Sequence, residues 1–398
     1  MRDRDPSVAR AFWAVALVSL PALFAVGGCG DDAAGGPDAG PDAEVICGPV
    51  APETRPHGRL VVATEQYGSG GGITVIDLDT LEPSINVALA HDDVTVRWFD
   101  DRIWVLNRFG ADNLMILDGR TYGLQKQFSV RPGENQACNP HDLVFLDRCR
   151  VYMSCFEQAR IYVVDPTAPL GEELVGSIDL SSLSDADGLP ELSHMALVDG
   201  LVYVAVERLV RSSGWVAAPP SYLAVLDPAT DALVDAIELS ELNPVGPLVP
   251  IPGTSDLLVA AGGDWSGGAA GLLRIDTQAG SSILALSSAD LGGLVASFTL
   301  GPDGCGHAVI MAPVTFDTGV VRFCLDGTVE PCLPIGNEIF TAVAQVDDGR
   351  LLVTDTTYTT PGVRVYDPEN CTELLSDPIP TGFTPGFTDS LLLIPRGP

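Results

Sequence analysis

One short motif repeats along most of this 398-residue chain and constrains its fold more than any other feature. The motif is an apolar strand that ends in aspartate, and it occurs about every 48 residues. Its seven copies end at Asp77, Asp118, Asp165, Asp227, Asp276, Asp326 and Asp367. A recurring period of this length is typical of repeat architectures, in which every unit is one supersecondary motif.

Each unit contains four predicted strands. A second apolar strand precedes the one that ends in aspartate, as in VYVAV at 202–206. A turn rich in Pro, Thr and Gly follows the aspartate and leads into a more polar strand, such as LVDAIEL at 233–239. A fourth strand closes most units, for example HDLVFL at 141–146.

Seven units of four strands predict an all-β fold, a seven-bladed β-propeller of four-stranded blades. A solenoid is the alternative, but it would need distinct polar caps at both ends, and we find none. The first unit begins with its second strand at Leu60, and an unassigned apolar strand follows the last unit at 390–394. We therefore expect the ring to close by pairing this C-terminal strand into the first blade.

The units resemble the YVTN family of bacterial propeller repeats, in which a V-Y-V strand, a V-V-D-P strand and a Thr-Gly-like turn recur. The resemblance covers residues 60–394, with departures such as LLRID at 272–276 and Cys324 inside its strand. It implies a propeller. Because propellers of this kind are binding platforms and related ring folds host enzymes, the resemblance leaves the function open.

The N-terminus carries the features of an export signal. Arg2, Arg4 and Arg10 precede a sixteen-residue apolar stretch at 11–26, which is short for a membrane span. Gly27 and Gly28 then precede Cys29, a pattern that resembles the bacterial lipobox. The alternative is an ordinary signal peptide followed by a chance cysteine.

These features divide the chain into three parts. Residues 1–28 form the predicted lipoprotein signal peptide, 29–46 the lipidated Cys29 and a flexible tether rich in Gly, Pro, Asp and Ala, and 47–398 the propeller. Since Gly30 rather than Asp follows Cys29, the resemblance to lipoproteins implies the outer membrane of a Gram-negative bacterium.

The charge of the chain excludes one class of partner. The formal net charge is −32, with 21 basic and 53 acidic side chains. A field of this sign repels phosphate backbones and anionic lipid surfaces. We therefore expect no nucleic acid partner, and a membrane contact only through the N-terminal lipid.

Eight cysteines remain once Cys29 is assigned to lipid, and an exported protein is expected to pair them in disulfides. Cys305 and Cys324 flank a hairpin turn symmetrically, so that paired strands would place them opposite each other. Cys138 and Cys155 flank the turn at Asp147 in a similar way. Pairing of Cys324 with Cys332 is the nearest competitor, and zinc ligation is disfavoured because no C-x-x-C pair occurs.

Long loops join the second to the third strand and each blade to the next, and both kinds lie on one face of a propeller. Binding residues concentrate on such loops. The alternative for the loop at 207–222 is that it covers the channel mouth, with its tryptophan buried and its arginines paired to acidic residues. The candidate ligand-binding residues are Arg208, Arg211, Trp215, Tyr222 and Trp265.

Three histidines fall near the start of successive innermost strands. His91, His141 and His194 could approach one another at the channel mouth and bind a transition metal such as zinc or copper. The alternative is that they make ordinary hydrogen bonds, because their positions differ by one or two residues between units. No other cofactor is predicted.

The sequence favours a monomeric, non-enzymatic envelope protein that binds a protein, a glycan or a small molecule through the long-loop face. The second hypothesis is a metal-dependent propeller hydrolase or lyase with its site at the channel mouth. The third is a purely structural envelope protein. None of the short catalytic motifs that identify common hydrolases and nucleotide-binding enzymes occurs, so no catalytic residue is predicted.

The first testable prediction concerns Cys29. Replacing Cys29 with serine removes the thiol that would carry the lipid, so the Cys29→Ser protein should leave the membrane fraction or stay unprocessed. Mass spectrometry of the mature wild-type protein should find a lipidated N-terminal cysteine. An unmodified Cys29 in that protein would show that the anchor is wrongly assigned.

Overall fold

The computed structural model describes residues 47–66, 68–264, 270–336, 340–357, 359–387 and 389–396. The predicted signal peptide at 1–28 and the lipidation site and tether at 29–46 lie outside the described residues. Within the described part, no helix is long and apolar enough to cross a membrane.

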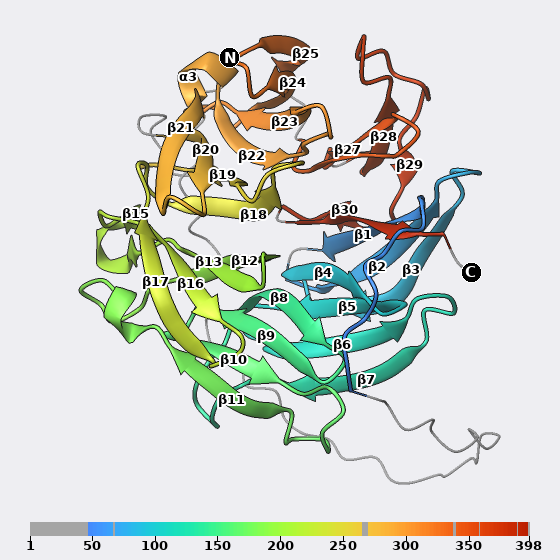
Figure 1. The fold of residues 1–398 in the computed structure, drawn as a ribbon. Helices are drawn as coiled ribbons and strands as arrows, with labels where there is room; N and C mark the ends of the chain where they lie inside the picture. The colour runs from blue at the N-terminus through green and yellow to red at the C-terminus, as the bar shows by residue number, and fades with distance from the viewer. Residues whose placement is uncertain are drawn as a thin grey trace, which may run out of the picture.

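Seven four-stranded antiparallel sheets surround a common axis, which confirms the predicted seven-bladed β-propeller (Figure 1). In every blade but the first, four strands run outward from the axis in chain order. The chain passes around the ring once, so that its red C-terminal strands lie beside blue β1.

Each blade consists of four strands, ordered from the axis outward. They are β31 (Leu391–Pro395), β1 (His57–Gln66), β2 (Gly70–Asp77) and β3 (Pro83–Ala90); β4 (Val94–Phe99), β5 (Arg102–Asn107), β6 (Asn113–Asp118) and β7 (Leu124–Ser129); β8 (Pro140–Asp147), β9 (Arg150–Cys155), β10 (Arg160–Val164) and β11 (Leu174–Asp179); β12 (Leu192–Val198), β13 (Leu201–Val206), β16 (Tyr222–Asp227) and β17 (Ala232–Glu238); β18 (Pro244–Pro250), β19 (Leu257–Ala261), β20 (Gly271–Asp276) and β21 (Ser281–Ser287); β22 (Leu294–Phe298), β23 (Cys305–Met311), β24 (Thr318–Cys324) and β25 (Val329–Gly336); and β26 (Val343–Gln345), β27 (Leu351–Asp355), β28 (Gly362–Tyr366) and β29 (Ile379–Pro380).

The remaining described elements are short and lie in connections. They are η2 (Ser181–Leu183), the two-stranded hairpin of β14 (Leu209–Val210) and β15 (Val216–Ala217), η3 (Arg211–Ser213), α3 (Ser288–Leu291) and β30 (Thr384–Pro385), which also pairs with β1 as a fifth strand of the first sheet. We call the segment from β14 to β15 the flap.

The ring closes as the sequence predicts. The C-terminal strand β31 takes the innermost place in the first blade and pairs antiparallel with β1, with Leu393 opposite Leu60 and Leu392 opposite Val61. Ile394 is fully buried in the core shared by the first and second blades. The strands that complete one blade therefore come from both ends of the described chain.

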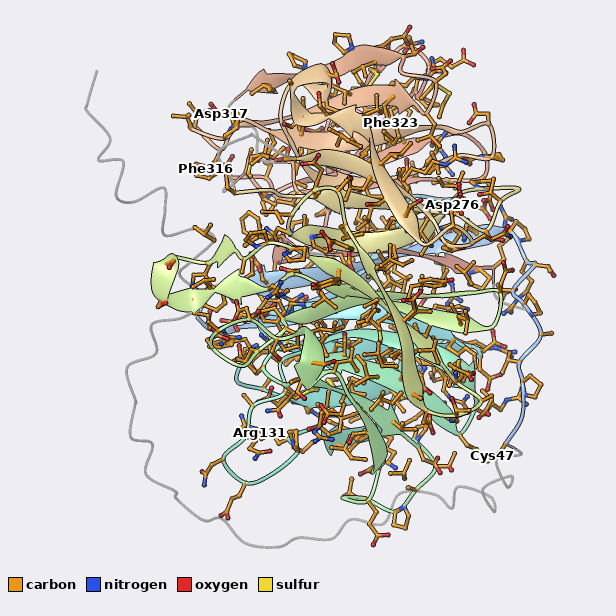
Figure 2. The ribbon with its side chains drawn as sticks, turned by 60° about the vertical axis from the view of Figure 1, so that its left-hand side comes forward. Cys47, Arg131, Asp276, Phe316, Asp317 and Phe323 are labelled. Atoms are coloured by element: carbon orange, nitrogen blue, oxygen red, sulfur yellow. A yellow bond between two sulfur atoms is a disulfide. The ribbon has the colours of Figure 1, made fainter. Side chains whose placement is uncertain are left out.

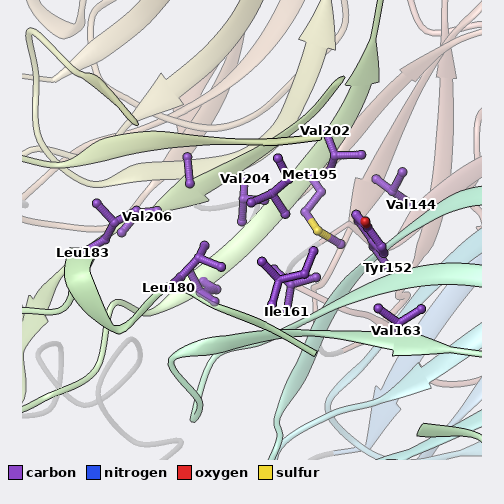
Figure 3. Packing of buried hydrophobic residues seen from close by; sticks show 14 residues of the cluster. Val144, Tyr152, Ile161, Val163, Leu180, Leu183, Met195, Val202, Val204 and Val206 are labelled. Atoms are coloured by element: carbon purple, nitrogen blue, oxygen red, sulfur yellow. The ribbon is translucent and has the colours of Figure 1, made fainter. Parts of the chain in front are cut away.

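Apolar side chains fill the space between neighbouring blades. Figure 3 shows one such layer, in which Val144 and Tyr152 of the third blade meet Val202 and Val204 of the fourth. Buried strands of this kind read as continuous runs of Val, Leu and Ile because both of their faces are covered. Stacking of one blade on the next is therefore the main source of apolar burial.

The two faces of the ring differ. Arg131, Phe316 and the flap lie on one side of the molecule, which we call the long-loop face, and Cys47 and Asp276 lie on the other (Figure 2). The second side carries the turns that follow the repeated aspartates, and we call it the aspartate-turn face. The long loops and the tight turns are thus separated by the whole depth of the blades.

The seven repeated aspartates have one structural role. The side chain of each accepts a hydrogen bond from the backbone N–H two residues later, at 2.8–3.0 Å. In the second blade, Asp118 also accepts bonds from the N–H and hydroxyl of Thr121. These Asx turns explain why aspartate marks the end of the third strand in every unit.

Four disulfides join the eight described cysteines. Cys305 pairs with Cys324 across the β23–β24 hairpin, and Cys138 with Cys155, as the turn positions predict. The pairing of Cys324 with Cys332 is therefore wrong. Cys332 is joined instead to Cys371, which links the sixth blade to the seventh, and Cys47 is joined to Cys149.

Asp118→Ala tests the role of the turn aspartates. Its backbone and hydroxyl hydrogen bonds hold the pKa of Asp118 below its usual range. A group with a lowered folded-state pKa stabilises the fold fully above its unfolded value, near pH 4, and loses this effect as the pH falls through the folded-state value. Asp118→Ala should therefore lower the free energy of unfolding by about 1 kcal/mol at pH 7, and the deficit should shrink below pH 4.

Chemical denaturation at several pH values measures this difference. The control is Glu172→Ala, which removes an exposed acid that is not one of the seven repeated aspartates and should change stability by less than about 0.5 kcal/mol. A deficit in Asp118→Ala that is the same at pH 3 and pH 7 would contradict the proposed role of the ionised carboxylate.

Candidate functional site

The channel mouth on the long-loop face holds a cluster of charged side chains. Arg97 comes from β4, Asp142 from β8 and His194 from β12, the innermost strands of three successive blades. Asp389 lies two residues before β31. Because innermost strands border the axis, these four residues, which we call the mouth cluster, meet where the second, third and fourth blades face the closing strand.

Arg97 connects the two acids of the mouth cluster. Its Nε lies 2.5 Å from Asp142 Oδ1, and its Nη2 lies 2.9 Å from Asp389 Oδ2. Asp389 Oδ2 also lies 2.8 Å from His194 Nε2. These contacts form one continuous series. They join Asp142 of the third blade to Arg97 of the second, Arg97 to Asp389 of the closing segment, and Asp389 to His194 of the fourth blade.

Asp142 is fixed by backbone as well as by Arg97. Its Oδ1 accepts a hydrogen bond from the N–H of Leu143, and its Oδ2 accepts one from the N–H of Met195 on the neighbouring blade, both at 2.7 Å. Asp142 is only 3% exposed. The carboxylate thus holds the third and fourth blades together at the mouth.

The ionic contacts keep two members of the mouth cluster, Arg97 and Asp389, charged. Burial by itself would raise the pKa of Asp389, but His194 and Arg97 together hold that pKa well below its usual range. Burial would also lower the pKa of Arg97, and the carboxylates of Asp142 and Asp389 raise it instead. Arg97 and Asp389 therefore carry their charges at neutral pH.

A second group of side chains surrounds this cluster. His141 stacks on Phe156, with ring centroids 4.4 Å apart. Burial and the nearby Arg108 hold the pKa of His141 well below its usual range, so the imidazole is neutral at pH 7. Glu207, at the end of β13, is 6% exposed, and burial raises its pKa to about 7.

The structure does not support the predicted three-histidine metal site. No group of three or more His, Cys, Asp or Glu side chains that could hold a metal ion occurs within the described ranges. His91 turns toward Asp92, 3.0 Å away, while His141 stacks on Phe156 and His194 binds Asp389. Because the three histidine positions differ by one or two residues between units, each imidazole ring contacts a different partner.

The candidate ligand-binding residues of the fourth blade contact one another and the loops below them. Arg211 lies 4.8 Å from the ring centre of Trp215, and its Nη1 and Nε contact Glu157 at 2.6 Å and Glu191 at 3.0 Å. The pairing of Arg211 with acidic residues agrees with one part of the alternative, whereas Trp215 remains half-buried rather than buried.

The other two described candidates are also paired. Arg208 lies over the ring of Tyr222 and donates a hydrogen bond to the Pro220 carbonyl. Trp265 lies outside the described residues. A binding role for these side chains stays a prediction.

Sequence reasoning identified only part of the mouth. Asp142 and Glu191 lie near His141 and His194 in the sequence, but their ionic partners are arginines from other elements. Arg97 and Asp389 were missed. The available signal was an arginine inside an otherwise apolar innermost strand and an aspartate directly before the closing strand.

Comparison with known proteins gives the fold alone. No family model matches the chain, and no curated protein matches it. A chain of hydrazine synthase from Kuenenia stuttgartiensis is 17% identical, with a TM-score of 0.51 over 69% of this chain and 76% of that one. A chain of the mitotic checkpoint complex is 14% identical, with a TM-score of 0.50 over 74% and 82%.

Arg211→Ala tests whether ionic contacts hold the flap. The substitution leaves Glu191, whose side chain is fully buried, and Glu157 without their cation. We expect the free energy of unfolding to fall by about 3 kcal/mol, measured by chemical denaturation. Arg160→Ala removes an exposed pair with Asp179 and should cost less than about 1 kcal/mol. Equal losses in the two variants would mean that the flap is not held by these contacts.

Proposed function

We propose that this protein is a lipid-anchored β-propeller of the cell envelope that acts as a binding module through its long-loop face. The partner is a protein, a glycan or a small molecule. The resemblance of the repeats to the YVTN family and of the N-terminus to bacterial lipoproteins supports an envelope protein, at the outer membrane of a Gram-negative bacterium.

The observation that carries this proposal is the difference between the two faces. On the long-loop face, buried charged side chains from several blades converge at one point, the mouth cluster. On the other face, the repeated aspartates bond to their own turns. Burying a charged side chain costs free energy. Charged side chains that are buried without stabilising a turn concentrate at functional sites.

The orientation of the ring supports the same assignment. Cys47, the first described residue, lies on the aspartate-turn face, where the Cys47–Cys149 disulfide joins it to the turn between β8 and β9 (Figure 2). A lipid on Cys29 would therefore attach through the aspartate-turn face. The long-loop face would then point away from the membrane, toward partners in solution.

The net charge restricts the classes of partner that the protein can bind. A chain with 53 acidic and 21 basic side chains repels polyanions. Nucleic acids and anionic lipid surfaces are thus excluded from the proposal. The protein is proposed to act as a monomer that contacts the membrane only through its lipid.

Photo-crosslinking from each face tests the proposal. A photoreactive phenylalanine analogue is placed at Val314, which is 84% exposed on the long-loop face, or at Gln278, which is exposed on the aspartate-turn face. Both variants are irradiated in the envelope fraction of the native bacterium. We expect crosslinked products from Val314 and none from Gln278. Products from Gln278 alone, or from both positions equally, would contradict the assignment of the face.

A further inference from the structure

The first described segment of the chain crosses three blades. Residues 47–56, which we call the strap, run over the aspartate-turn face from Cys47 to the start of β1 (Figure 2). Cys47 is bonded to Cys149, which lies in the turn between β8 and β9 of the third blade. The strap therefore begins on the third blade, although it leads into the first.

The end of the strap at the first blade is held by the backbone. The N–H of Arg396, directly after β31, donates a hydrogen bond to the Pro56 carbonyl at 2.9 Å. In the middle of the strap, Arg55 Nη2 lies 2.6 Å from Asp101 Oδ1 of the second blade, and these side chains are 31% and 47% exposed. Exposed ion pairs contribute little stability. Since residues 51–54 are themselves exposed, the middle of the strap is held weakly.

At the third blade, the Cys47–Cys149 disulfide is the main attachment of the strap. A second contact there is the hydrogen bond that the N–H of Arg148 donates to the Gly48 carbonyl. Its length of 3.4 Å exceeds the usual range for hydrogen bonds between backbone groups. One covalent bond therefore decides whether the strap stays on the third blade.

This disulfide is also the most accessible of the four. Cys47 is the one exposed cysteine in the part of the chain that the structure describes, whereas Cys138 and Cys155 are fully buried. The cysteines of the other two pairs are half-buried. Exchange between a thiol and a disulfide requires that a thiolate reach one of the sulfur atoms. Exposure therefore favours attack at Cys47.

We propose that the Cys47–Cys149 disulfide is a site of thiol–disulfide exchange, and that its reduction by an external dithiol releases the strap from the third blade. A thiolate of the dithiol attacks Sγ of Cys47, the S–S bond breaks, and Cys149 leaves as a thiolate that takes up a proton. The second thiol of the dithiol then displaces Cys47. Two electrons and two protons pass to the cysteine pair, and the dithiol becomes a disulfide.

Release of the strap changes where the chain leaves the propeller. With the disulfide intact, the chain leaves at the third blade. After reduction, the first firm contact is that of Pro56, beside the first blade. Residues 48–56 then add up to about 30 Å of extended chain between the propeller and a lipid on Cys29. This consequence rests on the proposed function, and it would let the long-loop face reach further from the membrane.

Alkylation of the purified full-length protein tests the exchange step. The protein is treated with dithiothreitol, sampled at intervals into excess N-ethylmaleimide, and analysed by peptide mass spectrometry. Cys47 and Cys149 should be labelled about tenfold faster than the cysteines of the other three pairs, because Cys47 is exposed. Labelling no faster than that of Cys305 and Cys324 would overturn the proposal. Reduced thioredoxin in place of dithiothreitol distinguishes a dithiol protein from a small dithiol as the reductant.

Spin labels test the release of the strap. They are carried by unnatural amino acids at Ala51 on the strap and at Arg120 in the second blade, both exposed, so that every cysteine is left in place. Double electron–electron resonance should give a narrow distance distribution in the oxidised protein and a broader, longer one after reduction. An unchanged distribution in the reduced protein would overturn the release.

Two double variants separate this disulfide from a general effect of reduction. The variant with Cys47→Ser and Cys149→Ser should give the broad distribution without any reductant. The matched control with Cys305→Ser and Cys324→Ser removes a disulfide within one hairpin and should keep the narrow distribution. Equal broadening in the two variants would overturn the assignment to Cys47 and Cys149.

Energy transfer in vesicles tests the consequence at the membrane. A donor fluorophore at Gln278 on the aspartate-turn face and an acceptor dye in phosphatidylcholine vesicles report the height of the anchored protein. Transfer should fall after reduction, because the released strap lengthens the tether. Unchanged transfer would overturn this consequence. Because the alkylation and spin-label measurements do not depend on a lipid, the exchange site and the proposed anchor fail separately.

Discussion

The pairing of β31 with β1 is the contact on which the rest of the propeller depends. Each blade buries its apolar faces only against its two neighbours, so an open ring would expose one face at each end. The antiparallel pairing of Leu393 with Leu60 and the burial of Ile394 close that gap. The Cys332–Cys371 disulfide adds a covalent link between the last two blades.

Closure also assembles the mouth cluster. Asp389 lies directly before the closing strand and binds both Arg97 and His194, which come from the second and fourth blades. The mouth therefore exists only in the closed ring. Since the same segment completes the core and the charged cluster, a change that opened the ring would remove the mouth cluster with the fold.

Sequence features within each repeated unit were sufficient to predict the architecture. The aspartate that ends each third strand marks a turn that its own side chain stabilises, as Asp118 does with the N–H of Arg120. The spacing of these turns predicted the number of blades, and the symmetric positions of Cys305 and Cys324 about one hairpin predicted their disulfide. All of these features depend on residues close together in the chain, where strand period and turn chemistry restrict the possibilities.

The contacts of the site were decided only by tertiary structure. Arg97 and Asp389 are 292 residues apart in the chain, and no local pattern shows which strand of one blade faces which residue of another. The three histidines share similar sequence positions, yet offsets of one or two residues give each a different partner. The sequence by itself determined a closed ring of seven blades, because repeated local interactions build each blade. Only the packed ring decided which charges meet at its mouth, because that depends on the register and stacking of strands far apart in the chain.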